Sequence, residues 1–86
     1  MSKTVQICNP RWHGIKGLQF QWNNETGKIC NLMQHDNDTF PFVGIPPVPV
    51  PTGISDGQLK DDLQDGTYPY DVDCCDRTAP KNVLIP

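Results

Sequence analysis

The chain has 86 residues, 36% of them hydrophobic and 20% charged, with a net charge of −3 and a mean hydropathy of −0.51. This length predicts one domain over residues 1–86 with a thin core. Seven aspartates against one lysine between positions 56 and 76 exclude the basic footprint that nucleic-acid binding requires. No run is long enough to span a membrane and no signal-peptide pattern is present, which favours a cytoplasmic protein.

Short strands are expected in the N-terminal third of the chain. Residues 4–8 are predicted to form the first strand, which Asn9-Pro10 ends. Residues 12–17 are expected to form a loop or a crossing segment. Apolar and polar residues alternate strictly over 18–22, and this period of two is typical of a half-buried strand.

A chain reversal is expected over residues 23–27, because Asn and Gly tolerate the positive φ angles of a tight hairpin. The strand that returns from it covers residues 28–34. Two settings of that strand stay open: either Ile29 and Met33 face inward, or Cys30 and Leu32 do.

Proline dominates the middle of the chain, with four in the run I-P-P-V-P-V-P over residues 45–51. Each proline lacks a backbone donor, so this run is excluded as a central strand. It could be a sheet edge, a crossing between two sheets, or a polyproline ligand for an aromatic groove.

A short helical turn is expected across residues 56–63. Ser55 and Gln58 have the spacing of a capping box, and Leu59 and Leu63 are four residues apart. Such a spacing places both leucines on one helical face, which would pack on the sheet.

The clearest alternation lies over residues 67–74 and predicts a half-buried strand, with the apolar run 82–85 as its neighbour. The fold class predicted from all these patterns is all-β. It is a small β-sandwich of cupredoxin or immunoglobulin type, with five to seven strands and one short helical turn, and a small barrel is the alternative closure.

Two segments resemble cupredoxins. Residues 18–24 resemble the strand that ends in Trp-x-Asn, and residues 66–74 resemble the Gly-Thr-Tyr-x-Tyr-x-x-x-Cys strand. The resemblance implies that Cys74 or Cys75 stands where the copper thiolate stands. A blue-copper site also needs two histidines and usually a weak axial methionine. Neither type follows these cysteines, so we expect this fold without the copper ligands and without a cofactor.

A fainter resemblance is to the bacterial DP-EP family of small β-sandwich proteins. Some members of that family cleave themselves at an Asp-Pro bond before the last strand. The matching dipeptide here is Ala79-Pro80, which lacks the aspartate. No serine, histidine and acid set and no phosphate-binding glycine loop is present either. We therefore expect no enzyme, and self-processing is kept only as an alternative.

The four cysteines, at 8, 30, 74 and 75, allow a disulfide framework with three connectivities. Without a secretory signal, free thiols are the expected state. Adjacent residues of a strand point to opposite faces, so Cys74 and Cys75 are expected to face apart. Arg77 is the only neighbouring cation that could lower a thiol pKa.

Two functions are weighed from these residues. The first is a non-enzymatic binding or assembly module that contacts a protein partner or a second copy, without nucleic acid or membrane. The second is a metal or thiol-redox protein that uses Cys74, Cys75 and His35. For the first function the expected contact patch consists of Trp12, Phe40, Phe42, Val48 and Val50.

Overall fold

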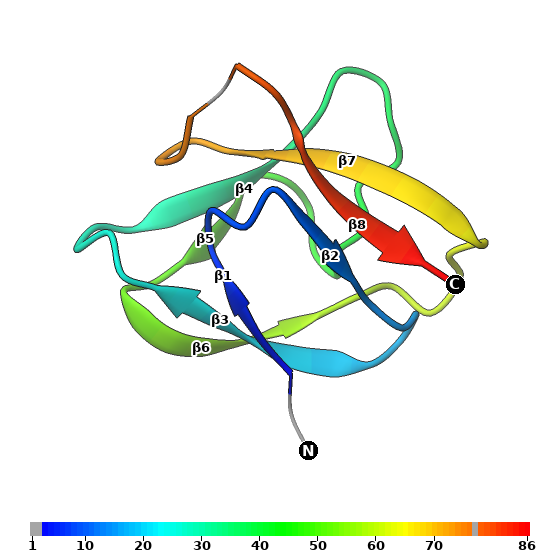
Figure 1. Cartoon of the computed structure of the whole chain (residues 1–86), viewed down its shortest axis with the longest axis horizontal. Coiled ribbons are helices and arrows are strands. Elements are labelled where there is room, and N and C mark those ends of the chain that lie inside the picture. The colour runs from blue at the N-terminus through cyan, green and yellow to red at the C-terminus, as the bar shows by residue number, and fades with distance from the viewer. Residues whose placement is uncertain (1–2, 77) are drawn as a thin grey trace.

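The computed structural model describes residues 3–76 and 78–86, and these form eight strands and no helix. The strands make a three-stranded sheet in the order β1-β3-β6 and a five-stranded sheet in the order β2-β8-β7-β4-β5. Figure 1 shows β4 and β7 crossing one side of the molecule and β3 and β6 crossing the other. The strands are β1 (Thr4–Gln6), β2 (Arg11–His13), β3 (Gln19–Asn24), β4 (Cys30–Gln34), β5 (Val48–Val50), β6 (Gly53–Gln58), β7 (Gly66–Val72) and β8 (Lys81–Ile85).

The all-β sandwich is confirmed, but the short helical turn is wrong. Six residues of β6 pair antiparallel with β3, from Gln19 opposite Gln58 to Asn24 opposite Gly53. This ladder satisfies the backbone groups that a single helical turn would leave largely unpaired. Leu59 and Leu63 are both buried, so their apolar character was a correct signal of burial but not of a helix.

The hairpin predicted over residues 23–27 is also wrong. The strands on either side of it, β3 and β4, belong to different sheets, so the chain crosses the sandwich here. Asn24 is buried, and its amide nitrogen donates to the carbonyls of Lys28 and Val50 at 2.9 and 3.1 Å. Its side-chain oxygen accepts from the Thr26 hydroxyl at 2.6 Å. These bonds hold a crossing turn with the same Asn chemistry that suggested a hairpin.

The structure shows which side chains of β4 face inward, a choice that the sequence left open. It pairs with β7 on one side and β5 on the other. Cys30 and Leu32 face the core, whereas Ile29 is 62% exposed. The proline-rich run supplies β5, which lies at the edge of the five-stranded sheet, where a strand with few donors is tolerated.

The C-terminal strands pair as predicted, with β7 antiparallel to β8. β2, expected to be part of a loop, adds to β8 in parallel, with Trp12 opposite Val83. Within residues 3–76 and 78–86 we find no helix with the length and apolarity of a membrane span.

An aromatic cluster fills the space between the sheets. Phe42 lies edge-on to Tyr70 and Trp22, at ring-centroid distances of 4.9 and 5.4 Å. The Trp12 indole donates to the Tyr70 hydroxyl at 2.8 Å, which satisfies both polar groups inside the core. Gly57 makes this packing possible, because a Cβ there would lie 2.6 Å from the Phe20 ring.

Candidate functional site

The candidate site is the end of the sandwich where the cysteines meet. β7 ends at Val72, and the next residues form a turn in which the Cys75 amide donates to the Val72 carbonyl at 3.1 Å. Because Cys74 and Cys75 lie in this turn, their sulfur atoms are 3.9 Å apart. The expectation that they face apart is therefore wrong, since it assumed that the strand continues through Cys74.

The four cysteines form two disulfides, Cys8–Cys75 and Cys30–Cys74. Their Cα atoms are 5.6 and 5.4 Å apart, within the range usual for disulfides. The expectation of free thiols is wrong for this structure. The partners are separated by 67 and 44 residues along the chain, so only the tertiary fold reveals that they meet.

The two bridges differ in position and accessibility. Cys8–Cys75 ties the loop after β1 to the turn after β7, and so it links the two sheets. Cys8 is exposed and Cys75 is half-buried. Cys30, the first residue of β4, is fully buried, and its partner Cys74 is half-buried in the turn after β7. A reductant in solution therefore reaches the first bridge more easily than the second.

Carbonyl and hydroxyl groups lie close to the sulfurs. The Ile7 carbonyl is 3.7 Å from the Cys75 sulfur. The Lys28 carbonyl and the Thr26 hydroxyl are 3.7 and 3.4 Å from the Cys30 sulfur. Oxygen acceptors are thus already in place for S–H groups formed by reduction.

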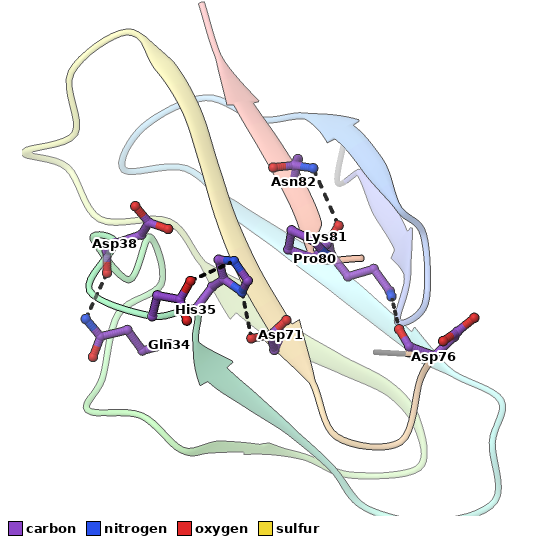
Figure 2. A network of polar contacts seen from close by, with 9 residues as sticks. Gln34, His35, Asp38, Asp71, Asp76, Pro80, Lys81 and Asn82 are labelled. Atoms are coloured by element: carbon purple, nitrogen blue, oxygen red, sulfur yellow. Dashed lines mark hydrogen bonds and ion pairs between the residues drawn. The ribbon is translucent and has the colours of Figure 1, made fainter. Parts of the chain in front are cut away.

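Charged groups border this end. Asp76 accepts from the Thr78 amide, and this bond, with a smaller contribution from the Lys81 charge, lowers the pKa of Asp76. The Lys81 ammonium donates to the Asp76 carbonyl at 2.9 Å, as Figure 2 shows. The Asp73 carboxylate accepts from the backbone and side-chain nitrogens of Asn31 at 2.9 and 2.8 Å. Arg77, named above as a neighbouring cation, lies outside the described residues.

The structure does not bring His35 to the cysteines. It follows the last residue of β4, whereas Cys30 begins that strand. Five residues of strand span about 16 Å. His35 instead contacts Asp71 on β7, with its Nδ1 3.0 Å from the carboxylate (Figure 2). A metal site that combines His35 with Cys74 is therefore excluded by geometry.

The His35–Asp71 pair predicts a pH-dependent contribution to stability. The hydrogen bond to Asp71 is the largest cause that raises the pKa of His35 above its ordinary value of 6.5. The folded state thus favours imidazolium, so its stabilising effect is full below pH 6.5 and is lost as the pH rises through the raised pKa.

We expect Asp71→Asn to lower the pKa of His35 in an NMR titration, and Asp36→Asn to lower it less. The difference in unfolding free energy between wild type and Asp71→Asn should be full below pH 6.5 and should shrink as the pH rises through the raised pKa of His35. An unchanged His35 pKa in Asp71→Asn would contradict the pairing.

The contact patch predicted from the sequence does not form a surface. Trp12, Phe40, Phe42 and Val50 are all at most 5% exposed, and Val48 is partly buried against the same core. These side chains belong to the core between the sheets or pack against it. Among the residues that the structure describes, the large apolar side chains that are exposed instead are Ile15, Leu18, Ile29, Val43, Ile45 and Ile54.

Two of these exposed residues lie at an apolar pocket that the sequence did not indicate. The pocket has a volume of about 410 Å³, and Trp12, Phe20 and Leu59 contribute buried walls. Ile15 and Leu18 are 57% and 54% exposed and also line it. Ile15 stands in no strand and no periodic signal marked it. Leu18 was predicted to begin the strand over residues 18–22, but it lies one residue before β3.

The two packed sheets and the cysteine-bearing turn after β7 define a cupredoxin-like β-sandwich. A purple cupredoxin from Nitrosopumilus maritimus is similar at 14% identity and a TM-score of 0.61, over 99% of this chain and 100% of that one. Amicyanin variants are similar too. One in the reduced state has a TM-score of 0.59 at 15% identity, and one in the Cu(I) form has 0.52 at 16%. Both matches cover 99% of this chain and 82% of amicyanin.

These identities are low, so the likeness concerns the fold alone. No family model matches the sequence, and no curated protein matches it.

Proposed function

We propose that this chain is a non-enzymatic thiol–disulfide redox protein on a cupredoxin-like fold. One observation carries the proposal: the sulfurs of Cys74 and Cys75 are 3.9 Å apart, and each is bonded to a cysteine from a distant segment. The two disulfides are therefore neighbours, and thiol–disulfide exchange between them is possible.

Contiguity allows exchange between the bridges. A dithiol that reduces Cys8–Cys75 leaves a thiolate at Cys75 beside the Cys74 sulfur. Attack of that thiolate forms a Cys74–Cys75 bond, breaks Cys30–Cys74, and places the electron pair on Cys30. The exposed cysteine thus gives electrons a route to Cys30, which solvent does not reach.

The same pairing argues against copper in the oxidised chain. Under the cupredoxin resemblance Cys74 stands at the thiolate position, but here its sulfur is bonded to Cys30. Metal binding by cysteine uses the thiolate, so in the proposed function the oxidised chain holds no copper.

We also propose a cytoplasmic location, where reversible opening of the two disulfides could sense the redox state. Cytoplasmic thiols are kept reduced by glutathione and thioredoxin systems, and disulfides found there are usually transient or redox-sensing. Oxidation would then form the two bridges, and the cellular dithiol pool would open them.

The test is a redox titration in dithiol buffers, followed by alkylation and peptide mass spectrometry. We expect Cys8–Cys75 to open first, while tryptophan fluorescence shows a folded chain, and we expect reoxidation to restore both pairs. The variant Cys8→Ser/Cys75→Ser removes the exchange route, so its Cys30–Cys74 bridge should be reduced more slowly than in wild type. If both bridges open only when the chain unfolds, their role is structural and the proposal fails.

A binding or assembly module is the second candidate, now on a different surface. The observation that favours it is the pocket rim at Ile15 and Leu18, beside the edge strand β2. Exposed edges can pair with a second copy, which is the occupant we propose. Concentration-dependent mass by light scattering would test this, with Ile15→Ser as the disrupting variant and Ile54→Ser as the matched control. A chain that stays monomeric at high concentration would exclude it.

A further inference from the structure

We propose that the reduced chain binds one thiophilic metal ion, Zn²⁺ or Cu⁺, through Cys8, Cys74 and Cys75, with Cys30 as the fourth ligand. The inference rests on the proposed function, because the ligands are thiolates that exist only after reduction. It adds to that function a class of ligand, a thiophilic metal ion, and names four cysteines and no histidine as the residues that bind it.

The spacing of the sulfurs fits such an ion. The sulfurs of Cys8, Cys74 and Cys75 lie within 4.8 Å of one another. Metal–sulfur bonds near 2.3 Å in a tetrahedron place the sulfurs about 3.8 Å apart. The Cys74 and Cys75 sulfurs are already 3.9 Å apart. Cys30 lies outside this group of three but is bonded to Cys74. Opening that bridge leaves the Cys30 thiol next to Cys74, and its side chain would turn toward the ion to complete the ligand set.

The surroundings can support bound thiolates. The Thr26 hydroxyl is 3.4 Å from the Cys30 sulfur and donates to the Asn24 side-chain oxygen at 2.6 Å. By turning away from Asn24 it would donate to a metal-bound Cys30 thiolate, as outer partners of metal ligands commonly do. The Lys81 ammonium, from the first residue of β8, donates to the carbonyl of Asp76, the residue that follows Cys75. Cys8 is exposed, which gives an ion a path in.

The chemistry balances as two steps. A dithiol reductant gives each bridge two electrons and two protons, and is itself oxidised to a disulfide. The metal ion then displaces the protons of the thiols it binds. Reduction removes two cross-links from a small domain, and the ion replaces them with a new one, so binding is coupled to stability. A small-molecule disulfide that accepts two electrons for each bridge, and is itself reduced to two thiols, closes the bridges and releases the ion.

The experiment uses the full chain reduced with a phosphine, with free thiols counted by alkylation, and adds Zn²⁺, Co²⁺ or Cu⁺ in separate arms. We expect one equivalent of Zn²⁺ by native mass spectrometry, and thiolate-to-metal charge-transfer absorption with Co²⁺. The four cysteines should be protected from alkylation, and the oxidised chain should bind no ion. In Cys8→Ser/Cys75→Ser the affinity for Zn²⁺ should fall by more than about 100-fold. Mutation of a residue that only hydrogen-bonds to a metal ligand can already lower metal affinity by up to that factor, and this variant removes two ligands. His35→Ala, at the far end of β4, is the matched control and should leave it unchanged.

A second preparation separates this inference from the proposed function. The chain is reduced in denaturant, which yields four thiols regardless of native-state reducibility, and is then refolded with Zn²⁺. Suppose that the refolded chain binds one equivalent of Zn²⁺ but that the bridges of the folded chain resist reduction. That result would contradict the redox function and support the metal site. A chain with four counted thiols that binds no ion in any arm overturns the site. So does binding that survives Cys8→Ser/Cys75→Ser at full affinity.

Discussion

Replacing Cys8 and Cys75 together by serine should lower the free energy of unfolding by about 3–4 kcal/mol under oxidising conditions. The bridge spans 67 residues and encloses the Cys30–Cys74 bridge. Chain-entropy estimates for the loop that remains give that magnitude. For a domain of this size the melting temperature should fall by on the order of 20 °C. Urea denaturation without reductant measures the first quantity and thermal melting the second.

The bridge accounts for most of this expected loss, because little packing is removed with it. Cys8 is exposed and Cys75 is only half-buried, so serine leaves no large cavity. Wild type in excess reductant loses Cys30–Cys74 as well, so it should be less stable than the oxidised variant. A loss below about 1 kcal/mol would show that the bridge barely constrains the unfolded chain and would contradict the chain-entropy model.

Phe42→Ala should cost about 3–5 kcal/mol, whereas Val43→Ala should change stability by less than about 0.5 kcal/mol. Phe42 is 2% exposed among Trp22, Tyr70 and Phe40, and its neighbour Val43 is 52% exposed. Truncation of the buried ring opens a cavity that the surrounding rings cannot fill.

Adjacent substitutions of similar kind make this a direct test of burial against surface contact. Denaturant unfolding of the two variants, with circular dichroism to confirm the fold, shows whether the Phe42 side chain is buried or lies at the surface. Similar small effects for both would mean that Phe42 lies on the surface, as the contact patch first required.

Strand identity was readable wherever the alternation of apolar residues was long enough. β3 and β7 were predicted within two residues of their observed ends, because burial of one face imposes a period of two. The proline run was excluded from the sheet interior for a local reason, the missing donors, and β5 is an edge strand.

Predictions failed where a local pattern has two structural solutions. Asn23 to Gly27 suits a hairpin and a crossing turn alike, and the bonds of Asn24 to Lys28 and Val50 decided between them. Ser55 to Gln58 carries a capping-box spacing, but six backbone pairs with β3 outweigh one turn of helix.

The sequence by itself determined the all-β class, and two of its strands indicated the cupredoxin-like fold. Only the tertiary structure decided the state of the cysteines and the burial of Phe42. Alternation reports which face of a strand is apolar, a property of neighbours in the chain. Disulfide pairing depends on distances between segments 44 and 67 residues apart. The turn after β7 also begins two residues earlier than predicted, which changes the directions in which Cys74 and Cys75 point.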